Sequence, residues 1–226
     1  MPISFKDFLK LILQDCAKAL NQCGITIYTD LVLEVLARHK NDWKIAMFFF
    51  VWASQQPGYN NGTETYNALL NILGKAQHFK TMWQLVKEMH NQGDSPSVVT
   101  DETFTILIRR YAAAHMVEST IETFDKREEF GLKLNAPAFQ ILICALCIYK
   151  HVQEAEALLN LRQNDFPMDM KSPNIILNGW CALANLHGAK RFWNELIKKG
   201  PFNIKEHFLI TIFANAEAAL IPYTHF

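Results

Sequence analysis

Apolar residues recur in this chain at helical spacing, in short paired stretches, and the pairs themselves repeat about every 35 residues. Successive copies start at spacings of 38, 35 and 34 residues, marked by Tyr66, Phe104, Phe139 and Pro173. The same shifts superpose Leu69 on Leu107, Leu142 and Ile176. A period of this size with two helical stretches per copy indicates stacked hairpins, because one hairpin cannot bury its apolar face alone. The fold class is therefore predicted to be all-α.

The repeat divides the chain into consecutive segments. Residues 1–25 are expected to hold an N-terminal capping helix at 5–20, and residues 26–62 a degenerate hairpin. Four clear copies are predicted at 63–100, 101–135, 136–169 and 170–203, and a divergent helix or tail at 204–226. The second helix of the second copy is expected to end at Gly131, where a left-handed residue can close it. Pro173 is expected in the first turn of its helix, and Gly200-Pro201 is expected to end the last copy.

Charge and composition narrow the classes of function. The chain of 226 residues has 22 basic and 22 acidic side chains, and residues 63–204 hold 15 of each. With no net basic field, any affinity for nucleic acid must come from local placement of charge. No apolar run is long enough to cross a bilayer, so we expect no membrane partner. Five cysteines, an odd number, do not indicate a disulfide framework and favour a reducing compartment.

Several strings resemble the pentatricopeptide repeat in its plant organellar form. Residues 65–70 and 174–181 are similar to the first helix of that repeat, and Glu88 and Met89 before Gly93 to the end of the second. Residues 42–59 are similar to the segment that precedes the first repeat. The resemblance implies a right-handed α-solenoid of stacked helix-turn-helix hairpins that binds single-stranded RNA, one repeat per nucleotide. It further implies a role in RNA processing, stabilisation or translation in the mitochondrion, or alternatively the plastid.

The resemblance also implies which side chains read bases. They are the residue after the aromatic position and the last residue of each repeat, polar groups that can hydrogen-bond the edge of an unstacked base. The pairs are Asn67 with Thr100, Thr105 with Asn135, Gln140 with Asp169, and Asn174 with Asn203 or Ile204. By the family pattern Thr105 with Asn135 favours adenine, and the copies with Asn67 and Asn174 favour pyrimidines. Lys75 is the expected phosphate contact, and the four first-helix side chains are expected to form one row along an open inner channel.

Other conspicuous residues have simpler interpretations. Cys144 and Cys147 fall on one predicted helix and are expected in the core, so no metal site and no cofactor are predicted. The large aromatic residues are expected to be core as well: Trp83, Trp180, Phe192 and Trp193. The basic pairs are expected on solvated faces: Arg109-Arg110, Lys190-Arg191 and Lys198-Lys199.

No phosphate loop, nucleophile elbow or metal-binding helix is present in the sequence, and we expect neither catalysis nor a small-molecule substrate. Two further functions stay open. One is a scaffold that binds protein partners, favoured by the neutral charge and sparse lysines. The other is a shortened family member with little RNA affinity.

Overall fold

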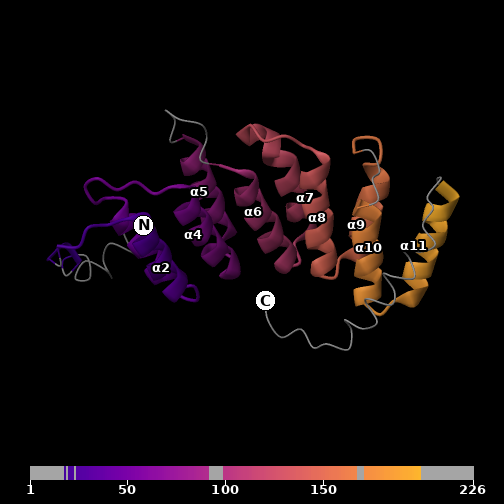
Figure 1. The fold of residues 1–226 in the computed structure, drawn as a ribbon, viewed down its shortest axis with the longest axis horizontal. Coiled ribbons are helices and arrows are strands. Elements are labelled where there is room, and N and C mark those ends of the chain that lie inside the picture. Colours follow the sequence, from indigo (N-terminus) through magenta and orange to yellow (C-terminus); the bar gives the residue numbers. More distant parts are fainter. Residues whose placement is uncertain (1–17, 19, 23, 92–98, 167–170, 200–226) are drawn as a thin grey trace, which may run out of the picture. The chain divides into compact units, whose positions relative to one another are not determined.

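The computed structural model describes residues 18, 20–22, 24–91, 99–166 and 171–199, and this part of the chain consists of helices and turns. The elements are α2 (Thr29–Arg38), α3 (Trp43–Ala53), α4 (Thr63–Lys75), α5 (Phe79–Asn91), α6 (Asp101–Ala113), α7 (Val117–Asp125), the 3-10 helix η1 (Lys126–Phe130), α8 (Ala136–Ile148), α9 (Val152–Leu161), α10 (Lys171–Ala182) and α11 (Leu186–Lys199) (Figure 1). None of these helices is long and apolar enough to span a membrane. The expected helix at 5–20 lies largely outside the described residues, and the segment 204–226 lies wholly outside them.

Four hairpin turns close in the same way. In each, one residue other than glycine has a positive φ: Gln77 at 58°, His115 at 59°, Lys150 at 71° and Ala184 at 54°. The amide of the next residue donates to a carbonyl five positions back: His78 to Leu73 at 2.9 Å, Met116 to Tyr111 at 3.1 Å, His151 to Leu146 at 2.8 Å and Asn185 to Trp180 at 3.1 Å. These bonds are those of the Schellman motif, which satisfies the last carbonyls of a helix. The main chain therefore sets the bend of each hairpin.

The second helix of the second copy departs from the expected form. It is α-helical only to Asp125 and continues as η1 before Gly131, whose φ is 76°. The tighter winding brings the Phe130 ring against Phe104, with ring centroids 5.6 Å apart. Gly131 does adopt the expected left-handed conformation, but it follows a 3-10 turn rather than an α-helix.

The chain divides into two units, residues 1–110 with 129–132 (unit 1) and residues 111–128 with 133–226 (unit 2). In unit 1, α2 packs on α3 and α4, and α4 packs on α3 and α5. Edge-to-face rings join consecutive hairpins, with the centroids of Phe50 and Tyr66 4.9 Å apart and those of Trp83 and Phe104 6.2 Å apart. One apolar cluster therefore runs through unit 1, as stacked hairpins require.

Unit 2 repeats this arrangement. Helix α8 packs on α7, α9 and α10, and α10 also packs on α9 and α11. In Figure 1, α11 follows the pair formed by α9 and α10. The rings of Phe139 and Phe166 stack at 4.5 Å, and Phe124 packs edge-on against both. Each hairpin of unit 2 thus buries its apolar face against a neighbour.

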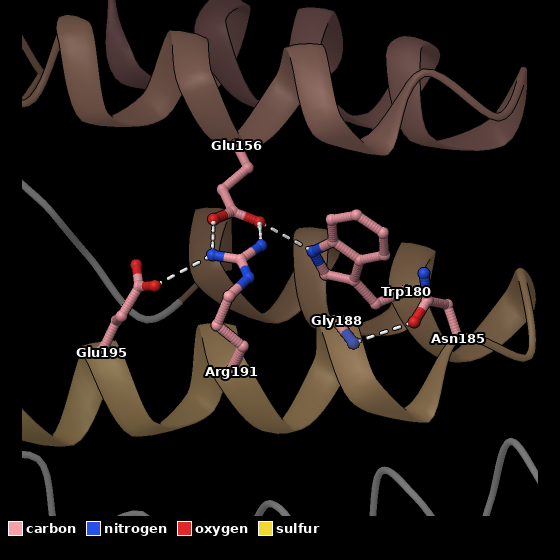
Figure 2. A network of polar contacts seen from close by, with 6 residues as sticks. All are labelled: Glu156, Trp180, Asn185, Gly188, Arg191 and Glu195. Carbon is pink, nitrogen blue, oxygen red and sulfur yellow. Dashed lines mark hydrogen bonds and ion pairs between the residues drawn. The ribbon is translucent and has the colours of Figure 1, made fainter.

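A polar cluster joins the second helices in unit 2 (Figure 2). The Glu156 carboxylate of α9 is 6% exposed and accepts two hydrogen bonds from the Arg191 guanidinium of α11, at 2.7 and 2.9 Å. It also accepts the indole N–H of Trp180 in α10, at 2.9 Å. Arg191 is exposed, as expected of a solvated face, and it also forms an ion pair across the stack, because a carboxylate as buried as that of Glu156 must be paired.

Candidate functional site

The expected base-reading residues of the first helices occupy equivalent turns. Asn67, Thr105 and Gln140 are the fifth residues of α4, α6 and α8, and Asn174 is the fourth residue of α10. Asn67 is 9% exposed and Thr105 6%, whereas Gln140 and Asn174 are half-buried. In unit 1 these side chains are therefore more enclosed than the open channel expected from the sequence.

Asn67 and Thr100, the expected pair of the first copy, are joined by Thr103. The Thr103 hydroxyl donates to Asn67 Oδ1 at 2.9 Å, across the contact between α4 and α6. It also lies 3.3 Å from the Thr100 hydroxyl and accepts the Thr100 amide at 3.2 Å. The sequence interpretation missed Thr103, although the repeat shift aligns it with Thr65 as the third residue of a first helix.

Thr105 and Asn135, the expected pair of the second copy, each bond within their own helix. The Thr105 hydroxyl donates to the Asp101 carbonyl at 2.8 Å. Exposed Asn135 is the N-cap of α8, and its Oδ1 accepts the Ala138 amide at 2.9 Å. Thr105 belongs to unit 1 and Asn135 to unit 2.

The remaining expected contacts are placed only in part. Asp169, Asn203 and Ile204 lie outside the described residues. Lys75 is exposed in the last turn of α4, where a cation is also favoured by the helix dipole.

Arg110 corrects the expectation that it forms part of a solvated face. Its side chain is half-buried and reaches from α6 back to Asn71 of α4, where Nε donates to Oδ1 at 2.9 Å and Nη2 donates to the same oxygen. The aliphatic part of Arg110 crosses Gly74, where a Cβ would lie 2.8 Å from Arg110 Cβ. Asn67 and Asn71, one turn apart on α4, therefore both bond side chains of α6.

The cysteines and aromatic residues lie mainly in the core, as expected. Cys147 is buried, and this burial, followed by the nearby Cys144, raises the pKa of its thiol to about 12. Such a thiol is neutral at physiological pH and is a poor nucleophile or metal ligand. Trp180, Phe192 and Trp193 are buried as well, and Trp83 is half-buried against Phe104 and Phe130.

Two histidines approach each other at the hairpin turns of unit 2. His115 Nδ1 and His151 Nε2 are 2.9 Å apart, and His151 Nδ1 is 3.6 Å from Glu154. At this distance one of the two ring nitrogens donates a hydrogen bond to the other. Within the described residues no group of three or more potential ligands could hold a metal ion.

Comparisons with known proteins agree with the repeat read from the sequence. The model of the PPR repeat matches residues 64–94, which span α4 and α5. A putative pentatricopeptide repeat-containing protein of Arabidopsis thaliana is 40% identical over 180 residues, which cover 80% of this chain and 34% of that protein. The chain belongs to the pentatricopeptide repeat family. A mitochondrial pentatricopeptide repeat-containing protein of the same plant is 41% identical over 178 residues, covering 78% of this chain and 31% of that protein.

The fold of this pentatricopeptide repeat chain is that of a solved helical-repeat solenoid. The crystal structure of the pentatricopeptide repeat protein PPR10 from maize matches 92% of the chain and 31% of the maize chain, with a TM-score of 0.60 and 21% identity. The expected α-solenoid fold class is therefore confirmed. The chain spans about a third of the length of the curated relatives it matches.

Proposed function

We propose that this pentatricopeptide repeat chain binds single-stranded RNA, and that it acts by binding rather than by catalysis. The observation that carries the proposal is the repeated polar position in the second turn of the first helices, in a chain that belongs to this family. The position holds Asn67, Thr105, Gln140 and Asn174. Amide and hydroxyl groups of this kind can hydrogen-bond the edges of unstacked bases.

In the proposed interface each first helix contributes one base-reading side chain, partnered by the last residue of its repeat. The hydrogen-bonded link from Asn67 to Thr100 supports such a pair in the first copy. Lys75 supplies a phosphate contact. The buried state of Asn67 and Thr105 means that a base must displace neighbouring side chains to reach them, and we expect this reorganisation to weaken binding.

The proposed compartment is the mitochondrion, where the RNA would be processed, stabilised or translated. Relatives that are named mitochondrial support this proposal; one is 41% identical and another 37% identical.

The equal numbers of basic and acidic side chains predict how RNA affinity should depend on salt. With few phosphate contacts, log affinity should fall only shallowly with log salt, by about 0.7 per contact.

The test is binding of short single-stranded RNAs that differ at one nucleotide, measured by fluorescence anisotropy over a salt series. Thr105→Val should abolish a preference for adenine at one position, because the valine keeps the shape of the side chain and removes its hydroxyl. Asn135→Ala should weaken the same preference. Equal affinity of the unmodified chain for every sequence would contradict base reading.

A protein-binding scaffold is the second candidate function. The burial of Asn67 and Thr105 and the balanced charge favour it, because a groove without a basic field can hold a peptide. Purification of the chain from plant mitochondria with and without nuclease separates the two functions. A partner that is lost on nuclease treatment supports RNA binding, and one that is retained supports the scaffold.

A further inference from the structure

Thr103 is placed to control the candidate base reader of the neighbouring hairpin. It is the third residue of α6, its side chain is 0% exposed, and its hydroxyl lies 2.9 Å from Asn67 Oδ1 in α4. A side chain this buried cannot touch RNA itself. We propose that Thr103 is a positioning residue that fixes the orientation of the Asn67 amide, an inference that rests on the proposed RNA-binding function.

The hydrogen bonds around Thr103 use its whole bonding capacity. A threonine hydroxyl has one hydrogen to donate and two lone pairs to accept with. Because Asn67 Oδ1 can only accept, the Thr103 hydrogen is directed to it. The Thr100 hydroxyl then donates across the 3.3 Å contact, and the Thr100 amide donates at 3.2 Å, so both lone pairs of Thr103 are filled. The Thr103 amide in turn donates to the Thr100 hydroxyl at 3.4 Å.

This arrangement determines what Asn67 offers to a base. With Oδ1 bonded to Thr103, the Nδ2 amino group is the donor that Asn67 can offer to a base. Because Thr103 already uses one of the two lone pairs of Oδ1, the first copy should prefer a base edge that presents an acceptor to Nδ2, such as a carbonyl oxygen. An amide free to flip would accept as well as donate and would discriminate less.

The chain contains a matched control for the loss of this hydroxyl. Thr65 is the third residue of α4, is likewise 0% exposed, and donates its hydroxyl to the Gly62 carbonyl at 2.9 Å. The fifth residue of α2, the position that Asn67 holds in α4, is Leu33, which has no polar side-chain atom. Thr65→Val thus removes the same group at the same depth without affecting a base reader.

The second copy supplies an internal control. For Thr105, the position corresponding to Thr103 in the next copy is Ala138, which has no hydroxyl. The Thr105 hydroxyl donates instead to the Asp101 carbonyl of its own helix. The nucleotide read by Thr105 should therefore not depend on Thr103.

The RNA experiment uses the full chain and a pool of randomised single-stranded RNA about ten nucleotides long, with bound sequences counted. Asn67→Ala identifies the nucleotide read by the first copy, because the preference there disappears. Thr103→Val should reduce the preference at that nucleotide about five- to tenfold and leave the Thr105 nucleotide unchanged. Thr103→Ser and Thr65→Val should both keep it. An unchanged preference in Thr103→Val, beside its loss in Asn67→Ala, would overturn the proposal.

A second measurement needs no RNA and separates this inference from the function on which it rests. Relaxation of the Asn67 side-chain ¹⁵N in the free chain should show a rigid amide in the unmodified protein and in Thr65→Val, and a more mobile one in Thr103→Val. Equal order in all three would disprove positioning, whatever the RNA pool shows. A rigid amide without any base preference would refute base reading and leave the positioning intact. Thr103→Ala replaces the valine variant if that one does not fold.

Discussion

The same two repeat positions meet where α4 packs against α6 and where α8 packs against α10, contacts called here the α4–α6 and α8–α10 joints. In one joint the glycine stands at the first position of the pair, and in the other it stands at the second. Between α4 and α6, Gly74 lies under the long side chain of Arg110. Between α8 and α10 the equivalent residues are Cys147 and Gly179, and a Cβ on Gly179 would lie 3.1 Å from the Cys147 sulfur. The glycine is therefore on the earlier helix in the α4–α6 joint and on the later helix in the α8–α10 joint. Close packing thus constrains the combined size of the pair rather than either residue alone.

The exchange also changes the chemistry of the two joints. Arg110 brings a charge to the α4–α6 joint and bonds Asn71, one turn from Asn67. The raised pKa of Cys147 keeps the α8–α10 joint neutral. Unit 2 has its buried charged contact between second helices instead, at Glu156 and Arg191. Changes at the joint in unit 1 should therefore reach the Asn67 position, whereas changes at the Glu156–Arg191 pair, which joins second helices, should mainly affect stability.

The largest expected effect is in unit 2. Glu156→Ala should lower the free energy of unfolding of α9–α11 by about 3 kcal/mol, because Arg191 and the Trp180 indole lose a shared acceptor. Hydrogen exchange resolved by helix, at increasing urea, measures the change. Glu195→Ala removes the exposed partner of Arg191 and should cost less than about 0.5 kcal/mol. RNA preference at the Asn67 nucleotide should stay the same in both, and a change there would break the division between the units.

Gly74→Ala tests the joint in unit 1. The new methyl group collides with Arg110 close to the main chain, and we expect a net loss of about 2 kcal/mol after the gain in helix propensity. Arg110→Ala on the Gly74→Ala background should recover part of this loss, measured as a coupling energy in a double-mutant cycle. Additive losses would mean that the two side chains do not compete for the same space.

A smaller, stabilising effect is expected at a hairpin turn. Ala184 has a φ of 54°, a conformation that costs an alanine more than a glycine. Ala184→Gly should therefore raise the free energy of unfolding of unit 2 by about 1 kcal/mol, measured by urea unfolding. Ala182→Gly, two residues earlier at the end of α10, should lower it by about 0.5 kcal/mol. A loss in both variants would show that the turn carries no such strain.

The smallest effect is expected for Gly179→Ala, which tests how tightly the α8–α10 joint is packed. Gly179→Ala brings a methyl group to 3.0 Å from Val152 and 3.1 Å from Cys147, contacts that a small shift can relieve. We expect a loss below about 1 kcal/mol, smaller than that of Gly74→Ala, because helix propensity offsets most of the strain. A loss as large as that of Gly74→Ala would mean that the α8–α10 joint is the tighter of the two.

The sequence predicted the helices better than the contacts between them. The copies predicted to begin at residues 63, 101, 136 and 170 open within one residue of the starts of α4, α6, α8 and α10, because apolar spacing and turn residues are local signals. Thr103 and Arg110 were not assigned their roles, since their partners lie 36 and 39 residues away on another helix. Periodicity gives the face of a helix on which a residue lies. It does not give the side chain that meets it there.

The left-handed position in each hairpin turn accepts side chains of different kinds. Glutamine, histidine, lysine and alanine succeed one another at the left-handed position, with φ values from 54° to 71°. Backbone hydrogen bonds close these turns, so the side chains at the left-handed position do not form the bend. A dye, crosslinker or affinity handle attached at Gln77 or Lys150 should therefore leave the geometry of the bend intact.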